Sequence, residues 1–155
     1  LIDTGAGINS DVLHLNAVAN EVIVVSTPEP TSIADAYALM KVMSQQHKLK
    51  RFKLLVNMAK DEREALNVYN NLLEVADRFL NISIEYLGFV VFDRKVSQAV
   101  MSRRIFCDLH PDAPAAKAME QIAASLATPS DQPQSVMTGN LQLFWRTLMM
   151  NEVSA

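Results

Sequence analysis

Three short, almost continuous hydrophobic runs alternate along the chain with longer stretches of helical spacing. The runs cover residues 21–26, 52–57 and 86–91 and are rich in β-branched and large apolar side chains. Such runs are typical of strands buried on both faces, as in parallel sheets. We expect a further strand at the very start of the chain, ending at Asp3.

The stretches between these runs predict helices. Apolar residues recur there at steps of three and four, at Ile33, Ala36, Tyr37, Met40 and Met43, and again at Leu66, Tyr69, Leu72, Leu73 and Ala76. Thr31 and Ser32 are the expected caps of the first of these helices, with Pro30 just before them. Pro111 and Pro114 open a further helix over residues 115–126.

This alternation predicts an α/β fold built of βαβ units, with a parallel sheet flanked by helices on both faces. Residues 1–127 form this domain. Residues 128–138 contain Pro129 and Pro133 among polar residues and read as a linker. A last, amphipathic helix is expected at residues 139–151.

Composition narrows the class of protein. The 155 residues are half hydrophobic and one-fifth charged, which suits a single globular domain. A net charge of −3 argues against nucleic-acid binding, although basic residues cluster at 47–53 and at Arg103 and Arg104. The single Cys107 excludes an intramolecular disulfide, and no run is long enough to span a membrane. We expect a cytoplasmic protein.

The opening segment, DTGAGI, allows two interpretations. Ligands of open α/β sheets bind outside the carboxyl ends of the strands, and Gly5 and Gly7 would let the backbone approach a ligand closely. Asp3 could then hold Mg²⁺ through water. Alternatively, Asp3 is a helix N-cap followed by a glycine turn. The segment is neither a G-x-G-x-x-G fingerprint nor a Walker A loop.

DTGAGI, the strand after it and the segment STPEPTSIADAY together resemble the MinD/ParA-type P-loop ATPases. Within that group the chain is most similar to the flagellar-number regulators FlhG and FleN. The resemblance continues through LVNM, YLGF and VSQAV and reaches about Leu126. It implies a MinD-like P-loop NTPase fold.

The resemblance assigns roles to residues in the opening loop. It makes Asp3 the Walker B-type acid that binds Mg²⁺ through water, and it makes the next residues the switch II loop that senses the γ-phosphate. These are Thr4, Gly5, Ala6 and Gly7.

It also assigns a base-binding group. Asn57 would read the adenine edge, and Val91, Phe92 and Asp93 would surround the base, although many relatives have proline where this chain has Val91. The residues alone allow that Asn57 ends a strand in a turn and that Asp93 is an N-cap.

A weaker assignment places Glu29 and Asp35 near a dimer interface. The alternative for Glu29 is an exposed loop.

The family's Walker A loop, which carries two lysines, has no counterpart in these 155 residues. Its amides and lysine hold the phosphates. We therefore expect no catalytic residue within this chain, and neither tight ATP binding nor hydrolysis by the chain alone. The resemblance implies that a longer parent protein binds ATP and Mg²⁺ and hydrolyses ATP.

The last predicted helix places apolar side chains on one face, at Leu141, Phe144, Trp145, Leu148 and Met149. Relatives carry C-terminal membrane-targeting helices, which implies peripheral contact with the inner face of the cell membrane. The alternative is a helix docked on the domain's own surface or in a partner's groove, because Arg146 is the one basic residue there.

The resemblance implies a nucleotide-switched regulator of flagellar number or placement that forms a homodimer on binding ATP. Its implied partners are the flagellar transcription activator and the flagellar GTPase FlhF. Two alternatives remain, namely a partition or division-site ATPase and a non-catalytic interaction domain.

Overall fold

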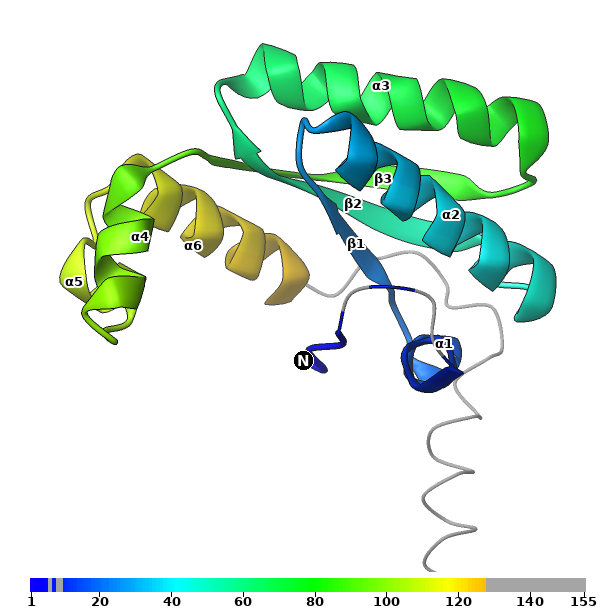
Figure 1. The fold of residues 1–155 in the computed structure, drawn as a ribbon, viewed down its shortest axis with the longest axis horizontal. Helices are drawn as coiled ribbons and strands as arrows, with labels where there is room; N and C mark the ends of the chain where they lie inside the picture. The colour runs from blue at the N-terminus through cyan, green and yellow to red at the C-terminus, as the bar shows by residue number, and fades with distance from the viewer. Residues whose placement is uncertain (6, 8–9, 128–155) are drawn as a thin grey trace, which may run out of the picture.

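The computed structural model describes residues 1–5, 7 and 10–127 (Figure 1). The predicted linker at 128–138 and the predicted helix with Leu141, Phe144, Trp145, Leu148 and Met149 lie outside these residues. No helix in the described part of the chain is long and apolar enough to cross a membrane.

Helices and strands alternate as the hydrophobic pattern predicts. The elements in chain order are α1 (Ser10–Val18), β1 (Ile23–Ser26), α2 (Pro30–Gln46), β2 (Arg51–Ala59), α3 (Glu62–Phe79), β3 (Ser83–Val91), α4 (Arg94–Met101), α5 (Phe106–Leu109) and α6 (Pro114–Ala127). Within the described residues the strands form a parallel sheet in the order β1-β2-β3. The α/β fold class is confirmed.

The strand expected at the start of the chain is absent, because residues 1–5 adopt no regular secondary structure. A strand needs a neighbour to receive its backbone hydrogen bonds. Strand β1, at one edge of the sheet, is hydrogen-bonded to β2 alone among the described elements. Leu1 and Ile2 are instead exposed.

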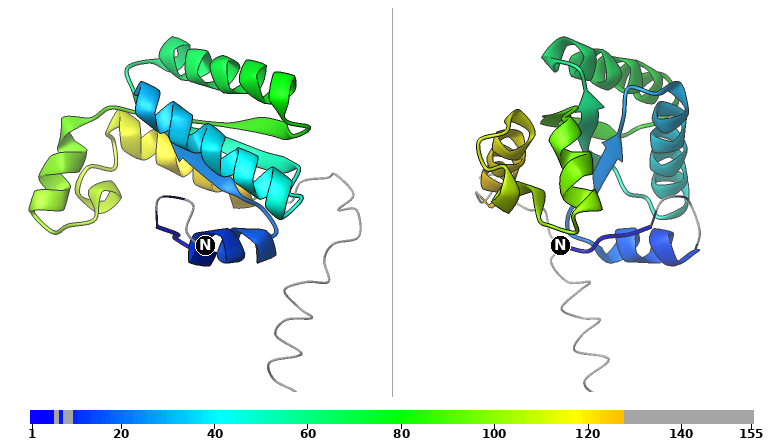
Figure 2. Two further views of the ribbon diagram at one scale, coloured as in Figure 1. Left: turned by 45° about the vertical axis from the view of Figure 1, so that its right-hand side comes forward. Right: turned by 60° about the vertical axis from the view of Figure 1, so that its left-hand side comes forward.

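Helices cover the sheet from both sides (Figures 1 and 2). Helices α2 and α3 pack on one face, where the main core contains fully buried side chains such as Met40, Met43, Leu54, Val56 and Leu72. Helix α6 lies against β3 on the other face, and a second cluster there includes Val90, Ala99, Phe106 and Ala116. The apolar face predicted for α2 therefore does pack in the core. The face predicted for α3 is confirmed except at Leu66, which is exposed, because the helix turns Ala65 and Val68 toward the sheet instead.

Helix α2 begins earlier than its predicted caps. Its N-cap is Glu29, and Pro30 occupies the first turn. Proline suits that position because its missing N–H needs no partner there. Thr31 and Ser32 thus lie inside the helix, so the prediction that they cap it is wrong.

Candidate functional site

The parallel strands bring three connecting loops to one edge of the sheet. β1 ends at Ser26, β2 at Ala59 and β3 at Val91. The carboxyl ends of parallel strands are where open α/β sheets bind ligands. The candidate site is built from these loops.

Asn57 lies at this edge beside the end of β3. It pairs with Val90 in the sheet register, and its Oδ1 accepts a hydrogen bond from the backbone N–H of Met58 at 2.9 Å. Met58 has φ of +59° and is half-exposed, and the register between β2 and β3 shifts here. A left-handed methionine is strained, and such strain gathers at functional sites. The local bond fixes the Asn57 amide, and among the described residues its NH₂ group remains available as a donor.

The other predicted base-binding residues follow directly at the end of β3. Val91 pairs with Ala59, and the N–H of Phe92 donates to the carbonyl of Ala59 at 2.8 Å. Phe92 is 51% exposed. The structure therefore brings Val91 and Phe92 to the strand end that carries Asn57.

Asp93 is the N-cap of α4. Its Oδ1 accepts the N–H of Lys95 at 2.9 Å. The capping alternative is thus realised, and one carboxylate oxygen is committed to the helix end.

The loop from β1 to α2 is held by side-chain hydrogen bonds. The N–H of Thr27 donates to Oγ of Ser32 at 2.9 Å, and Oγ of the fully buried Ser26 lies 3.3 Å from the same oxygen. Glu29 and Asp35, which were predicted to lie near a dimer interface, are both exposed. Neither side chain is buried in the core, so both are accessible to another chain.

The opening loop is not assembled with these residues. Asp3 and Gly5 are exposed, Thr4 is partly buried and Gly7 has φ of +106°, while Ala6 lies outside the described residues. The N-terminus lies beside α1, away from the carboxyl ends of the strands (Figures 1 and 2). Asp3 therefore ends no strand in this structure. Across the described residues, no group of three His, Cys, Asp or Glu side chains could hold a metal ion.

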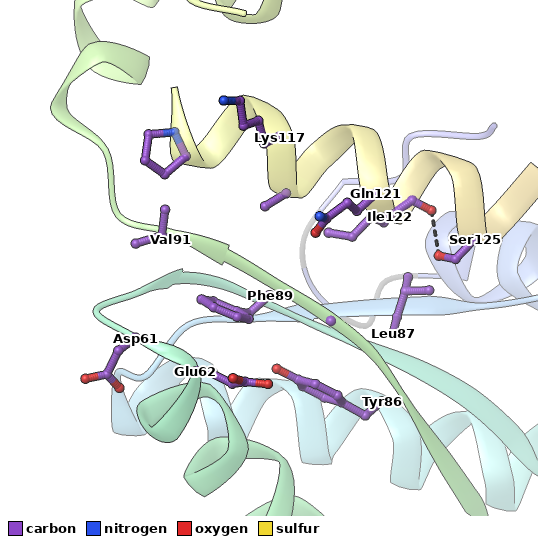
Figure 3. Close-up of a pocket in the computed structure, with 13 residues that line it drawn as sticks. Asp61, Glu62, Tyr86, Leu87, Phe89, Val91, Lys117, Gln121, Ile122 and Ser125 are labelled. Atoms are coloured by element: carbon purple, nitrogen blue, oxygen red, sulfur yellow. Dashed lines mark hydrogen bonds between the residues drawn. The ribbon is translucent and has the colours of Figure 1, made fainter. Parts of the chain in front are cut away.

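A cleft that the sequence analysis missed lies between β3 and α6 (Figure 3). It has a volume of about 760 Å³. Asp61 and Glu62 lie on the α3 side, and Lys117, Gln121 and Ile122 lie on the α6 side. The sequence signal that could have located it is Gly88, because a glycine inside a strand marks a bulge or a close backbone approach.

Tyr86 lines the cleft on the α3 side. Its hydroxyl is buried and has no hydrogen-bond partner among the described residues. Burial raises the pKa of the Tyr86 hydroxyl, and the negative charge of Glu62 raises this pKa further. A buried group of this kind on a cleft wall is a candidate to meet a ligand.

The chain is similar to several known proteins, among them two sequence relatives and one solved structure. The chain is 38% identical over 123 residues to the antiactivator FleN of Pseudomonas aeruginosa, covering 79% of this chain and 44% of that protein. It is 30% identical over 129 residues to the flagellum site-determining protein YlxH of Helicobacter pylori, covering 83% of this chain and 43% of that protein. The MinD cell division protein of Aquifex aeolicus matches with a TM-score of 0.60 and 21% identity, over 82% of this chain and 52% of the other.

No protein-family model matches the chain. The chain spans less than half the length of the two sequence relatives. The likeness to MinD establishes the fold, and the two sequence relatives each match about four-fifths of the chain. Over the part that it spans, the chain belongs to the MinD/ParA-type P-loop ATPase family, in the branch of the flagellar regulators FleN and FlhG.

Proposed function

We propose that the chain supplies the base-binding part of a nucleotide-switched, MinD-like ATPase that regulates flagellar number or placement. The observation that carries this proposal is the 38% identity to the antiactivator FleN over 123 residues. That match covers most of the described fold. The assembly of Asn57, Val91 and Phe92 at one edge of the sheet supports the nucleotide part of the proposal.

The residues present fit the adenine end of ATP. The NH₂ group of Asn57 donates to no other described residue and suits the adenine edge, and the exposed Phe92 offers an apolar surface beside it. ATP and Mg²⁺ are the proposed ligands, and the bound nucleotide supplies the γ-phosphate that distinguishes the two states of the switch. The phosphates need a glycine-rich loop with a lysine, and the 155 residues contain no such loop.

Asp3, Thr4, Gly5, Ala6 and Gly7 are the proposed switch II segment. Asp3 would hold Mg²⁺ through water once the segment is drawn to the carboxyl edge of the sheet. Asp3 is exposed in this structure, and contacts from the phosphate side of the site are proposed to draw the segment to that edge. Glu29 and Asp35 are proposed to face a second copy in an ATP-dependent homodimer.

Binding of a fluorescent ATP analogue tests the nucleotide part. The chain of 155 residues should show no saturable binding at micromolar concentrations. The longest open reading frame containing it should bind, and Asn57→Ala should weaken that binding about tenfold, the effect of one or two lost hydrogen bonds. Absence of ATP binding by the longer protein would refute the proposal.

Two variants of Asp93 distinguish a helix-capping role from a base-binding role in the same assay. Asp93→Ala removes the α4 cap and should lower the free energy of unfolding by about 1 kcal/mol. Asp93→Asn retains a capping oxygen, so it should preserve stability. If Asp93→Asn nevertheless weakens nucleotide binding, the carboxylate itself contacts the base, whereas unchanged binding assigns Asp93 to the cap alone.

Counting flagella by electron microscopy tests the regulatory part. Cells of the source organism that carry Asp3→Ala in the chromosomal gene should show altered flagellar number or position. The flagellar transcription activator and the flagellar GTPase are the proposed partners and should be recovered with the wild-type protein. Normal flagella with misplaced septa or lost plasmids would instead identify a division-site or partition ATPase.

Contact with the inner face of the cell membrane is proposed through the segment containing Trp145. Co-sedimentation of the protein with anionic vesicles should be lost on Trp145→Glu. Unchanged co-sedimentation would exclude this role for the segment.

A further inference from the structure

Strand β3 presents a free edge. In the described sheet it is hydrogen-bonded to β2 alone. Near its start the carbonyl of Ile84 accepts a hydrogen bond from the hydroxyl of Tyr69 at 3.1 Å, so a side chain rather than another strand satisfies this group. Beyond Ile84 the edge runs into the cleft. An edge strand exposes a row of backbone donors and acceptors that another strand can pair with.

The cleft follows this edge rather than one face of the sheet. Its lining includes the consecutive residues Tyr86, Leu87, Gly88 and Phe89, and side chains of successive strand residues point to opposite faces. Helix α6 forms the opposite wall (Figure 3). A volume of about 760 Å³ is in the range of sites that bind ligands.

Gly88 leaves bare backbone on the floor of the cleft. It has φ of +135°, and a Cβ built on it would come within 3.6 Å of Cγ1 of Ile122. A side chain at this position would be in ordinary van der Waals contact with Ile122, so α6 closely approaches the bare backbone of Gly88. The register shift between Leu54 and Leu55 places a bulge here, and this limits regular pairing to residues 88–91.

The walls of the cleft differ in character. Asp61 and Glu62 are both exposed and stand on the α3 side. On the α6 side Ile122 is apolar, and the charge of Lys117 is partly balanced by Asp112 at 3.6 Å. The hydroxyl of Tyr86, which has no partner in the part of the chain that the structure describes, adds a polar group beside Glu62 (Figure 3). The α3 side thus favours a cation, whereas the α6 side favours a small apolar group.

We propose that this cleft binds an extended peptide of a partner protein, which adds as a strand to the edge of β3 along residues 88–91. Alternate side chains of such a peptide point to the two sides of the sheet. The peptide would place a lysine or arginine toward Glu62 and Tyr86, and a small apolar side chain against Ile122. Backbone hydrogen bonds supply affinity and the acidic wall supplies specificity.

The proposal is tested by selecting a displayed library of random ten-residue peptides on the full chain. Enriched peptides should alternate basic and apolar residues. Their binding, measured by fluorescence polarisation, should weaken at least tenfold on Glu62→Lys. Asp77→Lys is the matched control, since Asp77 is an exposed acid on the same helix but outside the cleft, and this change should leave binding unaltered.

A change in the peptide backbone tests strand addition without altering the protein. N-methylation of the selected peptide at successive positions should abolish binding at every second residue and spare those between, because only alternate amides of an added strand face β3. Loss of binding at no position, equal loss at all positions, or equal affinity for Glu62→Lys and Asp77→Lys would overturn the proposal. So would failure of the library to yield any binder.

Two competing occupants are distinguished in the same assay. Unlabelled chain that displaces the peptide at micromolar concentration would show that a second copy occupies the cleft. Tighter peptide binding after deletion of residues 128–155 would show that the chain's own segment does so. Either result would overturn the assignment to a partner peptide. All of these measurements are made without nucleotide, so they are independent of the proposed ATPase function.

Discussion

The backbone N–H of Thr27 donates to the hydroxyl of Ser32 across 2.9 Å, which ties the end of β1 to the first turn of α2. The hydroxyl of the buried Ser26 lies 3.3 Å from the same oxygen. This one side chain therefore holds the loop that contains Glu29. The loop's shape depends on a hydroxyl inside the helix rather than on a side-chain cap at its first residue.

Ser32→Ala should lower the free energy of unfolding by about 1–2 kcal/mol, because the Thr27 amide loses its partner in a part-buried loop. Thr31→Ala is the matched control. It alters a neighbouring exposed hydroxyl, and its effect should stay below about 0.5 kcal/mol. Urea unfolding followed by circular dichroism measures both. Equal effects of the two changes would contradict the role given to Ser32.

At position 58 the usual order of stability of glycine and alanine variants should be reversed. In an ordinary strand, glycine is less stable than alanine by about 0.5–1 kcal/mol. At φ of +59° the order should invert, so that Met58→Gly is more stable than Met58→Ala by about 1 kcal/mol. Thermal unfolding of the two variants provides the measurement. A less stable glycine variant would show that this left-handed turn carries no strain.

Tyr86 and Tyr69 should respond in opposite directions to loss of the hydroxyl. Tyr86→Phe removes a buried hydroxyl that has no partner among the described residues, so the free energy of unfolding should rise by about 1 kcal/mol. Tyr69→Phe removes the hydrogen bond to the Ile84 carbonyl and should lower the free energy of unfolding by about the same amount. A loss of stability in Tyr86→Phe would mean that water or a further group satisfies the hydroxyl.

The pH dependence of stability should also differ in Tyr86→Phe. The pKa of Tyr86 is raised in the folded state, first by burial and then by Glu62. Below the unfolded pKa of about 10 this group's contribution is constant, and it is lost as the pH rises through the folded pKa. The wild type should therefore lose stability more steeply than Tyr86→Phe above about pH 10, as denaturant titrations would record. Parallel curves would contradict a raised pKa.

The edge of β1, which pairs with no strand other than β2 among the described residues, should promote self-association. Val25 on this strand is 53% exposed, and Leu1 and Ile2 are exposed as well. Exposed apolar edges pair with other chains. Light scattering should detect oligomers, and Val25→Lys should reduce them. Val100→Lys on α4 is a control of similar chemistry away from the sheet and should have little effect. A monomeric wild type at millimolar concentration would refute this expectation.

Local periodicity was enough to predict most of the fold. The runs at 21–26, 52–57 and 86–91 mark three strands, and the apolar faces of α2 and α3 follow from their spacing. A strand that is covered by helices on both faces needs apolar side chains at almost every position. Its hydrophobic run can therefore be recognised from the local sequence alone. The start of α2 was misjudged, because Thr31 and Ser32 are residue types that cap helices, whereas Pro30 suits the first helical turn and so places the cap before it, at Glu29.

The positions of candidate site residues were predicted correctly only for residues at the ends of strands that the structure contains. Asn57, Val91 and Phe92 were expected at adjacent strand ends, and the register of β2 and β3 places them there. Asp3 was expected to end a strand, but the strand is missing. A strand exists only when another strand receives its hydrogen bonds, and no described element does so for residues 1–5.

The sequence by itself determined the α/β class, the order of elements and the family, because each depends on patterns contained in short segments. The tertiary structure alone decided which edges of the sheet stay free and what stands beside them. The cleft beside Gly88 depends on Glu62 and Ile122, which are far apart in the chain and meet only when α3 and α6 pack around β3. No local pattern encodes that meeting, because it is set by how the helices pack on the sheet.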